Sequence, residues 1–341
     1  MRMWVGSMIF GVSMLGCTTS EQAMQAAACQ VQSLSSVGHD TMATTLPSTA
    51  EIAPWQLSTQ FRHVVTVVLE NQNYNAVMAD EFFQQLARRG VLFTHFFANF
   101  RPSYPNYLAM VAGDYLGTTG NEQMMLPATQ RSIADLLEAK ALTWRQYAEG
   151  YVGQCNTDDG GVLSAYRRKH VPFVSFANIT DNPTRCANIV PASEFDWTRL
   201  PNYAFYSPDM CNSGHDLCVA GRSWSTLTVD GIKTLLGDPQ PRIRQSARWL
   251  EEFLAPVFAN PSLLRDTLVV ITFDEGGGDA DNRVYTVFLG GAVNAGQQVG
   301  QCASHYNVLR TIEDNFGLGT LGAGDARVAA LAGAFRSAAK R

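Results

Sequence analysis

Two pairs of oxygen-bearing side chains follow apolar, β-branched runs in this sequence. Glu70 and Asn71 come after the first run, and Asp274 and Glu275 come after the second, directly before three glycines. Open α/β sheets bind ligands beyond the carboxyl ends of their strands, so we expect these four side chains to meet there. Such oxygen donors suit a divalent cation, and the glycines allow close approach of a ligand. For either pair alone, capping of a neighbouring helix explains the residues equally well.

Ser103 lies between these two pairs in the sequence and is the candidate nucleophile. It precedes by two residues a helix predicted for residues 105–112, which starts with Pro105. Free N–H groups and the dipole at a helix N-terminus favour phosphate oxygens, and a bound metal would lower the pKa of the hydroxyl. Asn106, one turn further on, could donate its amide to a phosphate oxygen. The alternative is that Ser103 only caps the helix.

The apolar periodicity predicts the elements that position these residues. Buried strands are expected at 62–69, 203–206, 267–273 and 284–289, and helices at 74–89, 105–112, 132–140, 242–258, 306–316 and 326–341. Strands that alternate with helices predict a three-layer α/β fold, with a mostly parallel central sheet and helices on both faces. Residues 150–200 have weaker periodicity and are interpreted as an insertion that covers the site.

Composition narrows the function classes. The chain has 341 residues, of which 46% are hydrophobic and 16% charged, so a large buried core is expected. The net charge of −5 provides no basic surface for nucleic acid. Anionic substrates would therefore be held by a metal or by a few placed cations.

The N-terminal region indicates export. Residues 1–17 combine Arg2, a short apolar stretch and Gly16-Cys17, which resembles a bacterial lipoprotein signal with Cys17 as the lipidated residue. An ordinary cleaved signal is the alternative. Residues 18–58 are predicted to be a flexible lead-in, and 59–341 a single domain. The expected location is periplasmic or at the outer surface, with membrane contact only through a lipid anchor.

Cysteine usage fits an exported chain. Of seven cysteines, six remain when Cys17 is set aside, and an oxidising compartment allows them to form disulfides. The first predicted pair is Cys211 with Cys218, which closes a short loop, and the second is Cys155 with Cys186. A structural zinc site is disfavoured because the sequence has no CxxC pair.

Five ordered segments resemble the phosphoesterase family of bacterial acid phosphatases and phospholipases C, within the alkaline phosphatase superfamily. The resemblance extends over residues 64–317. Its segments are Val68–Tyr74, Pro102–Tyr107, Tyr206–Asp209 leading to Gly214–Asp216, Ile271–Gly277, and Ser304–Glu313.

The resemblance implies roles for individual residues. Glu70, Asn71, Asp274 and Glu275 would bind the metal, and Ser103 would attack phosphorus. His305 would face the phosphate, with His215 or His170 as other catalytic candidates. Asn106, His170 and Asp216 are the candidate substrate-binding residues. Lys169 and Arg168 could supply positive charge to a phosphate, but the basic run Arg167-Arg168-Lys169 is interpreted as a solvated face, as such runs usually are.

These expectations combine into a metal-dependent hydrolase of phosphate monoesters that forms a phosphoseryl intermediate. The metal is Ca, Mg or Mn if oxygen ligands dominate, and Zn if histidines take part. A phospholipase C-type phosphodiesterase is the alternative activity, disfavoured because no extra lipid-binding domain is evident. A surface lipoprotein that binds phosphate-bearing ligands without turnover is the alternative of another class.

Overall fold

A computed structural model describes residues 60–161, 164–218, 237–278 and 281–336 of the chain. The predicted export signal, the anchor on Cys17 and the lead-in up to residue 58 lie outside the described residues and stay predictions. The buried core is one cluster that runs from Phe61 to Phe335.

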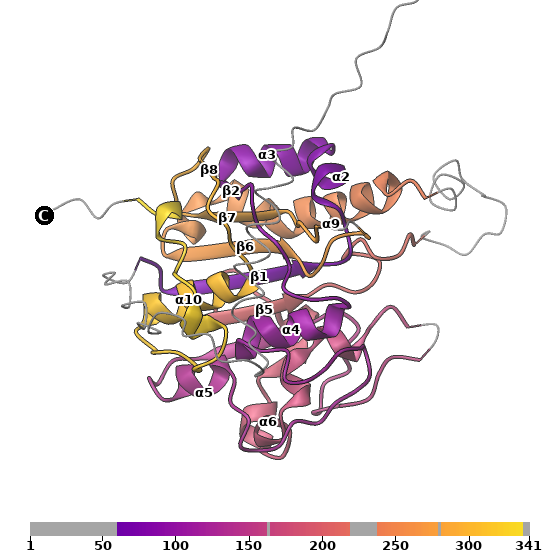
Figure 1. Cartoon of the computed structure of the whole chain (residues 1–341), viewed down its shortest axis with the longest axis vertical. Helices are drawn as coiled ribbons and strands as arrows, with labels where there is room; N and C mark the ends of the chain where they lie inside the picture. Colours follow the sequence, from indigo (N-terminus) through magenta and orange to yellow (C-terminus); the bar gives the residue numbers. More distant parts are fainter. Residues whose placement is uncertain (1–59, 162–163, 219–236, 279–280, 337–341) are drawn as a thin grey trace, which may run out of the picture.

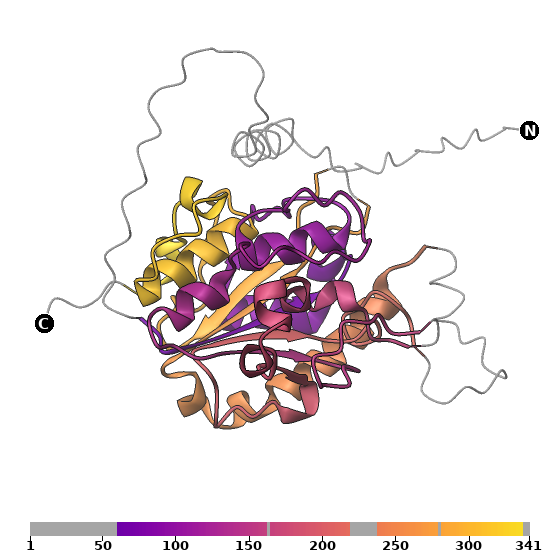
Figure 2. The same cartoon turned by 90° about the horizontal axis from the view of Figure 1, so that it is seen from below.

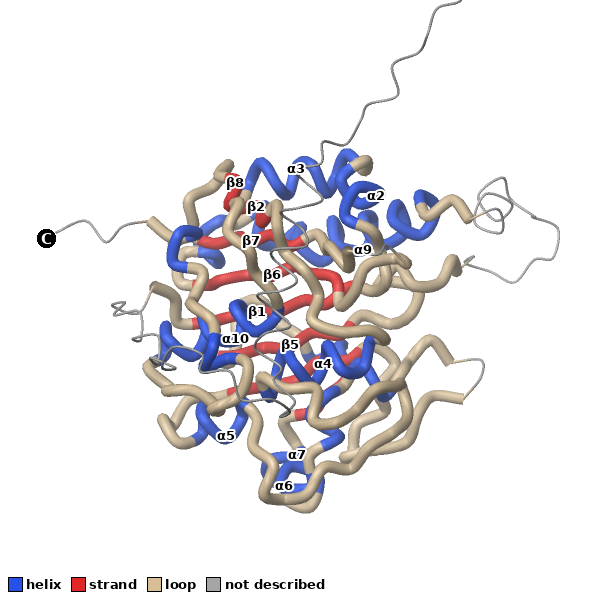
Figure 3. Tube along the Cα trace, in the orientation of Figure 1, coloured by secondary structure: helices blue, strands red, loops and turns tan. Residues whose placement is uncertain are grey.

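The centre of the molecule is one eight-stranded sheet, drawn in red in Figure 3. Its strands are β1 (His63–Leu69), β2 (Val91–Phe93), β3 (Trp144–Ala148), β4 (Ile189–Pro191), β5 (Tyr203–Ser207), β6 (Thr267–Phe273), β7 (Thr286–Gly290) and β8 (Gln298–Val299). They are ordered β4-β3-β5-β1-β6-β7-β2-β8. Among these strands only β7 runs antiparallel to its neighbours, β6 and β2. The sheet is therefore mostly parallel, as predicted.

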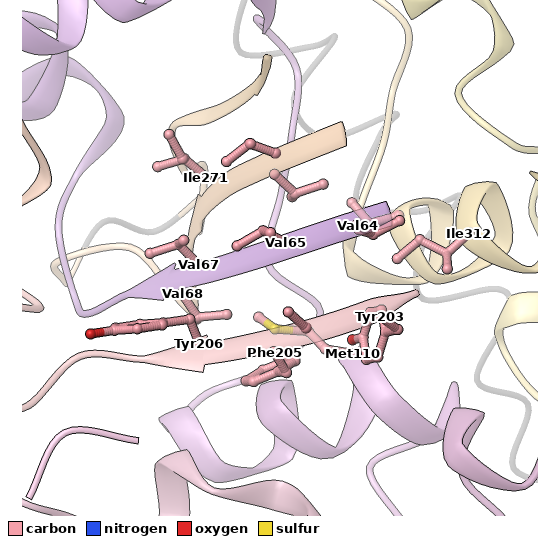
Figure 4. Close-up of a cluster of buried hydrophobic side chains, with 14 of the residues drawn as sticks. Val64, Val65, Val67, Val68, Met110, Tyr203, Phe205, Tyr206, Ile271 and Ile312 are labelled. Carbon is pink, nitrogen blue, oxygen red and sulfur yellow. The ribbon is translucent and has the colours of Figure 1, made fainter. Parts of the chain in front are cut away.

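Strands β1 and β6 form the middle of the sheet and are buried almost throughout. Val67 of β1 is paired with Ile271 of β6 in the register, and Figure 4 shows Val64, Val65, Val67 and Val68 along β1. β-branched side chains suit a strand that is covered on both faces, which is why both runs were recognisable in the sequence. The register pairs Leu69 with Phe273, so the residues that follow the two strands emerge side by side.

Helices cover both faces of this sheet (Figures 1 and 2). They are α2 (Tyr74–Met78), α3 (Glu81–Arg89), α4 (Ser103–Ala112), α5 (Ile133–Glu138), α6 (Ala177–Thr180), α7 (Pro183–Cys186), α9 (Gln240–Ala259) and α10 (His305–Phe316). Consecutive residues of β5 show the two faces, because successive side chains of a strand point to opposite sides. Phe205 packs on Tyr107 of α4, and Tyr206 packs on Phe253 of α9.

Short single-turn 3-10 helices complete the described structure. They are η1 (Arg168–His170), η2 (Pro172–Ser175), η3 (Ala192–Glu194), η4 (Pro261–Leu264), η5 (Asp325–Arg327) and η6 (Ala332–Ala334). Segment 150–200, interpreted as an insertion, contains η1, η2, α6, α7, β4 and η3, and it adds β4 to one edge of the sheet.

Two helix predictions were wrong in detail. The helix predicted for 74–89 is two helices, because Asp80 caps the second one by accepting from the N–H groups of Phe82 and Phe83. The terminal helix predicted for 326–341 is absent from its described part, which forms only η6 and the end of η5. There the chain bonds to a neighbouring loop instead of to itself, since Arg336 N–H donates to the carbonyl of Ala292.

The two predicted disulfides are confirmed. Cys155 pairs with Cys186, and Cys211 pairs with Cys218. Disulfides of this kind are typical of oxidising compartments, which agrees with an exported protein. The helices of the described residues are all too short or too polar to cross a membrane.

Candidate active site

Ser103 is the first residue of α4 and is only 1% exposed. The predicted helix therefore starts two residues earlier than expected, with Pro102 at the N-cap position. The Ser103 hydroxyl oxygen lies 3.2 Å from Glu70 Oε2 and 3.3 Å from Glu275 Oε1. It also accepts a hydrogen bond of 3.1 Å from the Lys169 ammonium. One hydroxyl thus contacts two carboxylates that could take its proton and a cation that could stabilise its negative charge.

The ends of β1 and β6 bring the two acidic pairs together, as the sequence predicts. Asp274 N–H donates to the carbonyl of Leu69, and Asn71 N–H donates to Asp274 Oδ1 at 3.0 Å. Asn71 has a φ of 51°, a left-handed conformation that Asn tolerates better than most residues. This turn directs the chain away from β1 directly after Glu70. Both acidic pairs therefore lie at the C-terminal ends of the two central strands, beside α4.

Glu70 is completely buried but well supplied with partners. Tyr107, one turn along α4 from Ser103, donates its hydroxyl to Glu70 Oε1 at 2.7 Å. His170 Nε2 lies 3.0 Å from the same oxygen, without the alignment of a hydrogen bond. The His170 ring stacks on Tyr107 at a centroid distance of 5.0 Å. Burial raises the pKa of Glu70, but contacts with His170, Lys169 and Tyr107 outweigh burial and hold that pKa below its usual value.

The pKa values of Asp274 and Glu275 are shifted upward, in the opposite direction to that of Glu70. The pKa of Asp274 is raised well above its usual value by burial and then by the negative charges of Glu70 and Glu275. Burial also raises the pKa of Glu275, although the Arg101 guanidinium at 3.5 Å acts against this rise. The site therefore concentrates more negative charge than its own cations neutralise.

The donor set suits a hard divalent cation. Asp274 Oδ2 and Asn71 Oδ1 are buried acceptors without a hydrogen-bond partner among the described residues. Buried polar atoms of this kind are rare in folded proteins and indicate a ligand or an ion that they could bind. No three His, Cys, Asp or Glu side chains of the described chain are arranged as a ready metal cluster. The candidate ligands instead combine carboxylates with an amide and a hydroxyl.

His305 contacts the backbone of the candidate metal ligand Asp274, and its expected position facing the phosphate stays a prediction. It begins α10, is 1% exposed, and its Nε2 lies 2.8 Å from the backbone oxygen of Asp274. A carbonyl can only accept, so Nε2 carries the proton. Burial lowers the pKa of His305 to about 4, which keeps the ring neutral. In this arrangement His305 positions the backbone of a candidate metal ligand.

Asn106 is also committed to the protein backbone. Its Oδ1 accepts from Phe100 N–H at 2.9 Å, and its Nδ2 donates to the carbonyl oxygens of Phe100 and Pro102 at 2.9 and 3.3 Å. These bonds tie the turn that precedes Ser103 to the first turn of α4. The structure thus gives Asn106 a positioning contact where the sequence suggested a contact with phosphate.

His215 and Asp216 lie at the surface of the site. His215 Nδ1 is 2.7 Å from Asp216 Oδ1, and the two side chains are 32% and 50% exposed. Burial lowers the pKa of His170, and Lys169 and then His215 act in the same direction. This exposed pair is therefore open to a substrate, unlike His305.

Three residues of the site were missed or misjudged from the sequence. Lys169 belongs to the basic run that was interpreted as a solvated face, yet it contacts Ser103. Tyr107 had no signal other than its position four residues after Ser103, which places both on one helix face. Arg101 donates to the carbonyl of Gly276 and pairs with Glu275. All three contacts join segments that are distant in the sequence or depend on the side-chain direction.

The fold and the site define a class of proteins. A protein of the alkaline phosphatase superfamily from Vibrio parahaemolyticus superposes with a TM-score of 0.50 at 12% identity, over 88% of this chain and 76% of that one. The lipoteichoic acid synthase of Listeria monocytogenes gives the same TM-score at 11% identity, over 89% and 81% of the two chains. The chain has the fold of the alkaline phosphatase superfamily.

Sequence comparison is more specific. Residues 78–319, more than half of the chain, match the Phosphoesterase family, and the chain belongs to this family. The "Probable acid phosphatase" of Kluyveromyces lactis is 32% identical over 84% of this chain and 69% of its own length. The "Acid phosphatase" of Aspergillus fumigatus is 32% identical, over 78% of this chain but only 57% of its own. The "Phosphatidylinositol-3-phosphatase" of Mycobacterium tuberculosis is 33% identical, over 76% and 78%. The chain is thus a hydrolase of phosphoric ester bonds.

Proposed function

We propose that this chain hydrolyses phosphate monoesters through a phosphoseryl intermediate on Ser103, with the help of a divalent metal ion. The observation that carries the proposal is the buried Ser103 hydroxyl, which contacts Glu70, Glu275 and Lys169 at the N-terminus of α4. Relatives named acid phosphatases support a monoester substrate.

The residues of the chain divide the chemistry between them. Glu70 accepts the proton of the Ser103 hydroxyl, because its Oε2 lies 3.2 Å from that hydroxyl and its lowered pKa keeps the carboxylate ionised. The Ser103 oxygen then forms a bond to phosphorus while the bond to the leaving oxygen breaks. The backbone N–H of Ser103 at the start of α4 and the Lys169 ammonium stabilise the negative charge that develops. Water cleaves the phosphoseryl bond in a second displacement, and phosphate and free Ser103 result.

Glu70, Asn71, Asp274 and Glu275 would hold the metal ion. The oxygen-only donor set favours Ca, Mg or Mn over Zn, because His305 is turned to a backbone carbonyl. When bound, such an ion supplies electrophilic stabilisation of the phosphoryl oxygens and lowers the pKa of a coordinated hydroxyl.

Replacement of Ser103 by Ala tests the nucleophile. We expect turnover of p-nitrophenyl phosphate to fall by about 10³-fold or more, as for other covalent nucleophiles, with an unchanged circular dichroism spectrum. Acid-quenched wild-type protein incubated with a ³²P-labelled monoester should retain label on Ser103. Activity in the Ser103→Ala variant close to that of the wild type would refute the covalent mechanism.

Two further assays separate the alternatives. Hydrolysis of p-nitrophenyl phosphorylcholine in preference to p-nitrophenyl phosphate would assign a phospholipase C-type phosphodiesterase. Elemental analysis combined with assays before and after chelation tests the metal. Full activity in metal-free protein would contradict the metal dependence.

A further inference from the structure

A small pocket of about 200 Å³ lies next to the candidate active site, and it is lined by three consecutive cationic residues. These are Arg167, Arg168 and Lys169, which the sequence analysis interpreted as a solvated face. We name this cavity the Arg168 pocket. The described function does not use it.

Two residues that line the Arg168 pocket connect it to the nucleophile. Lys169 lines the pocket and donates to the Ser103 hydroxyl at 3.1 Å. Tyr104, the residue after Ser103, also lines it, and its N–H donates to Oδ1 of Asn121, another lining residue. A phosphoryl group at Ser103 would therefore have the pocket as its immediate neighbour.

Arg168 is one of the residues that line this pocket, and its guanidinium is buried. Its side chain is 2% exposed, and Nη2 donates to the carbonyl oxygens of Met124 and Val174 at 2.8 and 3.3 Å. Nε and Nη1 are buried and have no hydrogen-bond partner among the described residues. Burial of unpaired charged donors is costly, so a ligand that accepts from them would be bound tightly.

The charge of the pocket favours an anion. Its one acidic lining residue, Asp159, is already engaged, because its Oδ1 accepts from the N–H groups of Arg168 and Gly160 at 2.7 and 3.0 Å. Two guanidinium groups and one ammonium group remain on the same wall. The volume is below the about 300–1,000 Å³ of typical small-molecule sites, so a single small group fits.

We propose that the Arg168 pocket binds a second anionic group, a phosphate or a carboxylate, carried by the leaving group of the substrate. The inference rests on the proposed function only in that it places the scissile phosphate at Ser103. Arg forks suit this role because they bind phosphate and carboxylate oxygens in pairs. Preferred substrates are then monoesters whose alcohol carries another negative charge a few bonds away.

Binding of non-hydrolysable ligands tests this without turnover. We expect metal-loaded wild-type protein to bind propane-1,3-diylbisphosphonate about tenfold or more tightly than propylphosphonate, as measured by titration calorimetry, because charge-assisted bonds have this strength. Replacement of Arg168 by Gln should bring the two dissociation constants together. Equal constants in the wild type would overturn the proposal.

Variants at exposed positions test the proposal even if the Arg168 variant does not fold. Gln123 lines the pocket and is exposed, so it can be changed without disturbing the core. Gln123→Glu should reduce the preference for the bisphosphonate severalfold, and Gln123→Lys should increase it. Thr129→Glu adds the same charge at an exposed position of the same segment outside the pocket lining and should leave the preference unchanged. An equal response to the two glutamates would show general repulsion and overturn the proposal.

The anion could belong to a soluble metabolite or to a lipid headgroup. Inositol 1,3-bisphosphate and dibutanoyl phosphatidylinositol 3-phosphate compare the two sources in the same titration. If inositol 1,3-bisphosphate binds and its binding requires Arg168, the ligand is a soluble compound. If only the phosphatidylinositol 3-phosphate binds in an Arg168-dependent way, the ligand is a lipid headgroup. Binding of both compounds that does not depend on Arg168 contradicts the proposal for the pocket. Hydrolysis of p-nitrophenyl phosphate, measured separately, decides the proposed function whatever the pocket binds.

Discussion

Two glutamates in different parts of the fold have no solvent exposure, and they show how differently the same buried side chain can behave. Glu70 follows β1 and contacts the Tyr107 hydroxyl, the Ser103 hydroxyl and the His170 ring. Glu313 lies on α10, and neither of its carboxylate oxygens has a hydrogen-bond partner among the described residues.

The difference in partners reverses the effect of burial. Burial raises the pKa of both side chains, yet the contacts of Glu70 with His170, Lys169 and Tyr107 bring its pKa below the usual value. At Glu313, burial and the neighbouring Asp325 act in the same direction and raise the pKa to about 10. A buried carboxylate is therefore available for chemistry only where the fold supplies donors.

The largest effect is expected when the charge of Glu70 is removed. Glu70→Gln keeps the shape but cannot accept the proton of Ser103, so we expect kcat/KM for p-nitrophenyl phosphate to fall about 10³-fold. Glu313→Gln should retain wild-type activity, because Glu313 does not contact the site. Comparable losses in the two variants would show that burial of a glutamate, and not its partners, determines its importance.

Lys169 should have the second largest effect. Lys169→Met removes the ammonium that donates to Ser103 but keeps the side-chain length. We expect kcat to fall about 10- to 100-fold, since one charged donor at the reacting oxygen is lost. Lys169→Arg should recover part of the rate. Equal kcat values for the Met and Arg variants in steady-state kinetics would contradict the role of the Lys169 charge.

The contrast between Lys169 and the strand ends also shows what the sequence could predict. Strands β1 and β6 were evident from continuous β-branched runs, and parallel strands must end at one edge, so Glu70 and Asp274 were expected to meet there. The short strands β2, β4 and β8 have only two or three residues each and carry no periodicity to detect. They form because neighbours in the sheet complete their hydrogen bonds.

The direction in which a side chain points could not be predicted from the sequence either. Nothing in the order of residues distinguishes Lys169, which contacts the nucleophile, from a solvated lysine in a basic run. In the same way, His305 and Asn106 lie at the positions the resemblance indicated, but their hydrogen bonds run to backbone atoms. The hydrogen-bond partner of each of these side chains depends on tertiary contacts between segments far apart in the sequence.

A smaller effect is expected from Tyr107, which supports Glu70. Tyr107→Phe removes one donor to Glu70 Oε1 and leaves the ring stacked on His170. Because this hydrogen bond helps to offset burial, the pKa of Glu70 should rise in the variant. We expect kcat/KM to fall about tenfold or less and its acid limb to move to higher pH. A pH profile with an unmoved acid limb would contradict this role.

The smallest effect concerns stability, at the other glutamate of the comparison. In the folded protein Glu313 holds its proton up to about pH 10, whereas its usual pKa is 4.5. The folded state therefore binds more protons than the unfolded state between these two values. The contribution of Glu313 is fully present below about pH 4.5 and is lost as the pH rises toward 10.

Glu313→Gln should remove this dependence because an amide does not titrate. Near pH 5 the variant and the wild type should melt at similar temperatures. At pH 8 the variant should be more stable by about 1 kcal/mol or more, which corresponds to about 2–4 °C in Tm. Glu251→Gln, at an exposed position of α9, is the matched control and should leave the pH dependence unchanged. If Glu313→Gln also left it unchanged, Glu313 would be ionised in the folded protein, and a donor like those of Glu70 would have to lie beside it.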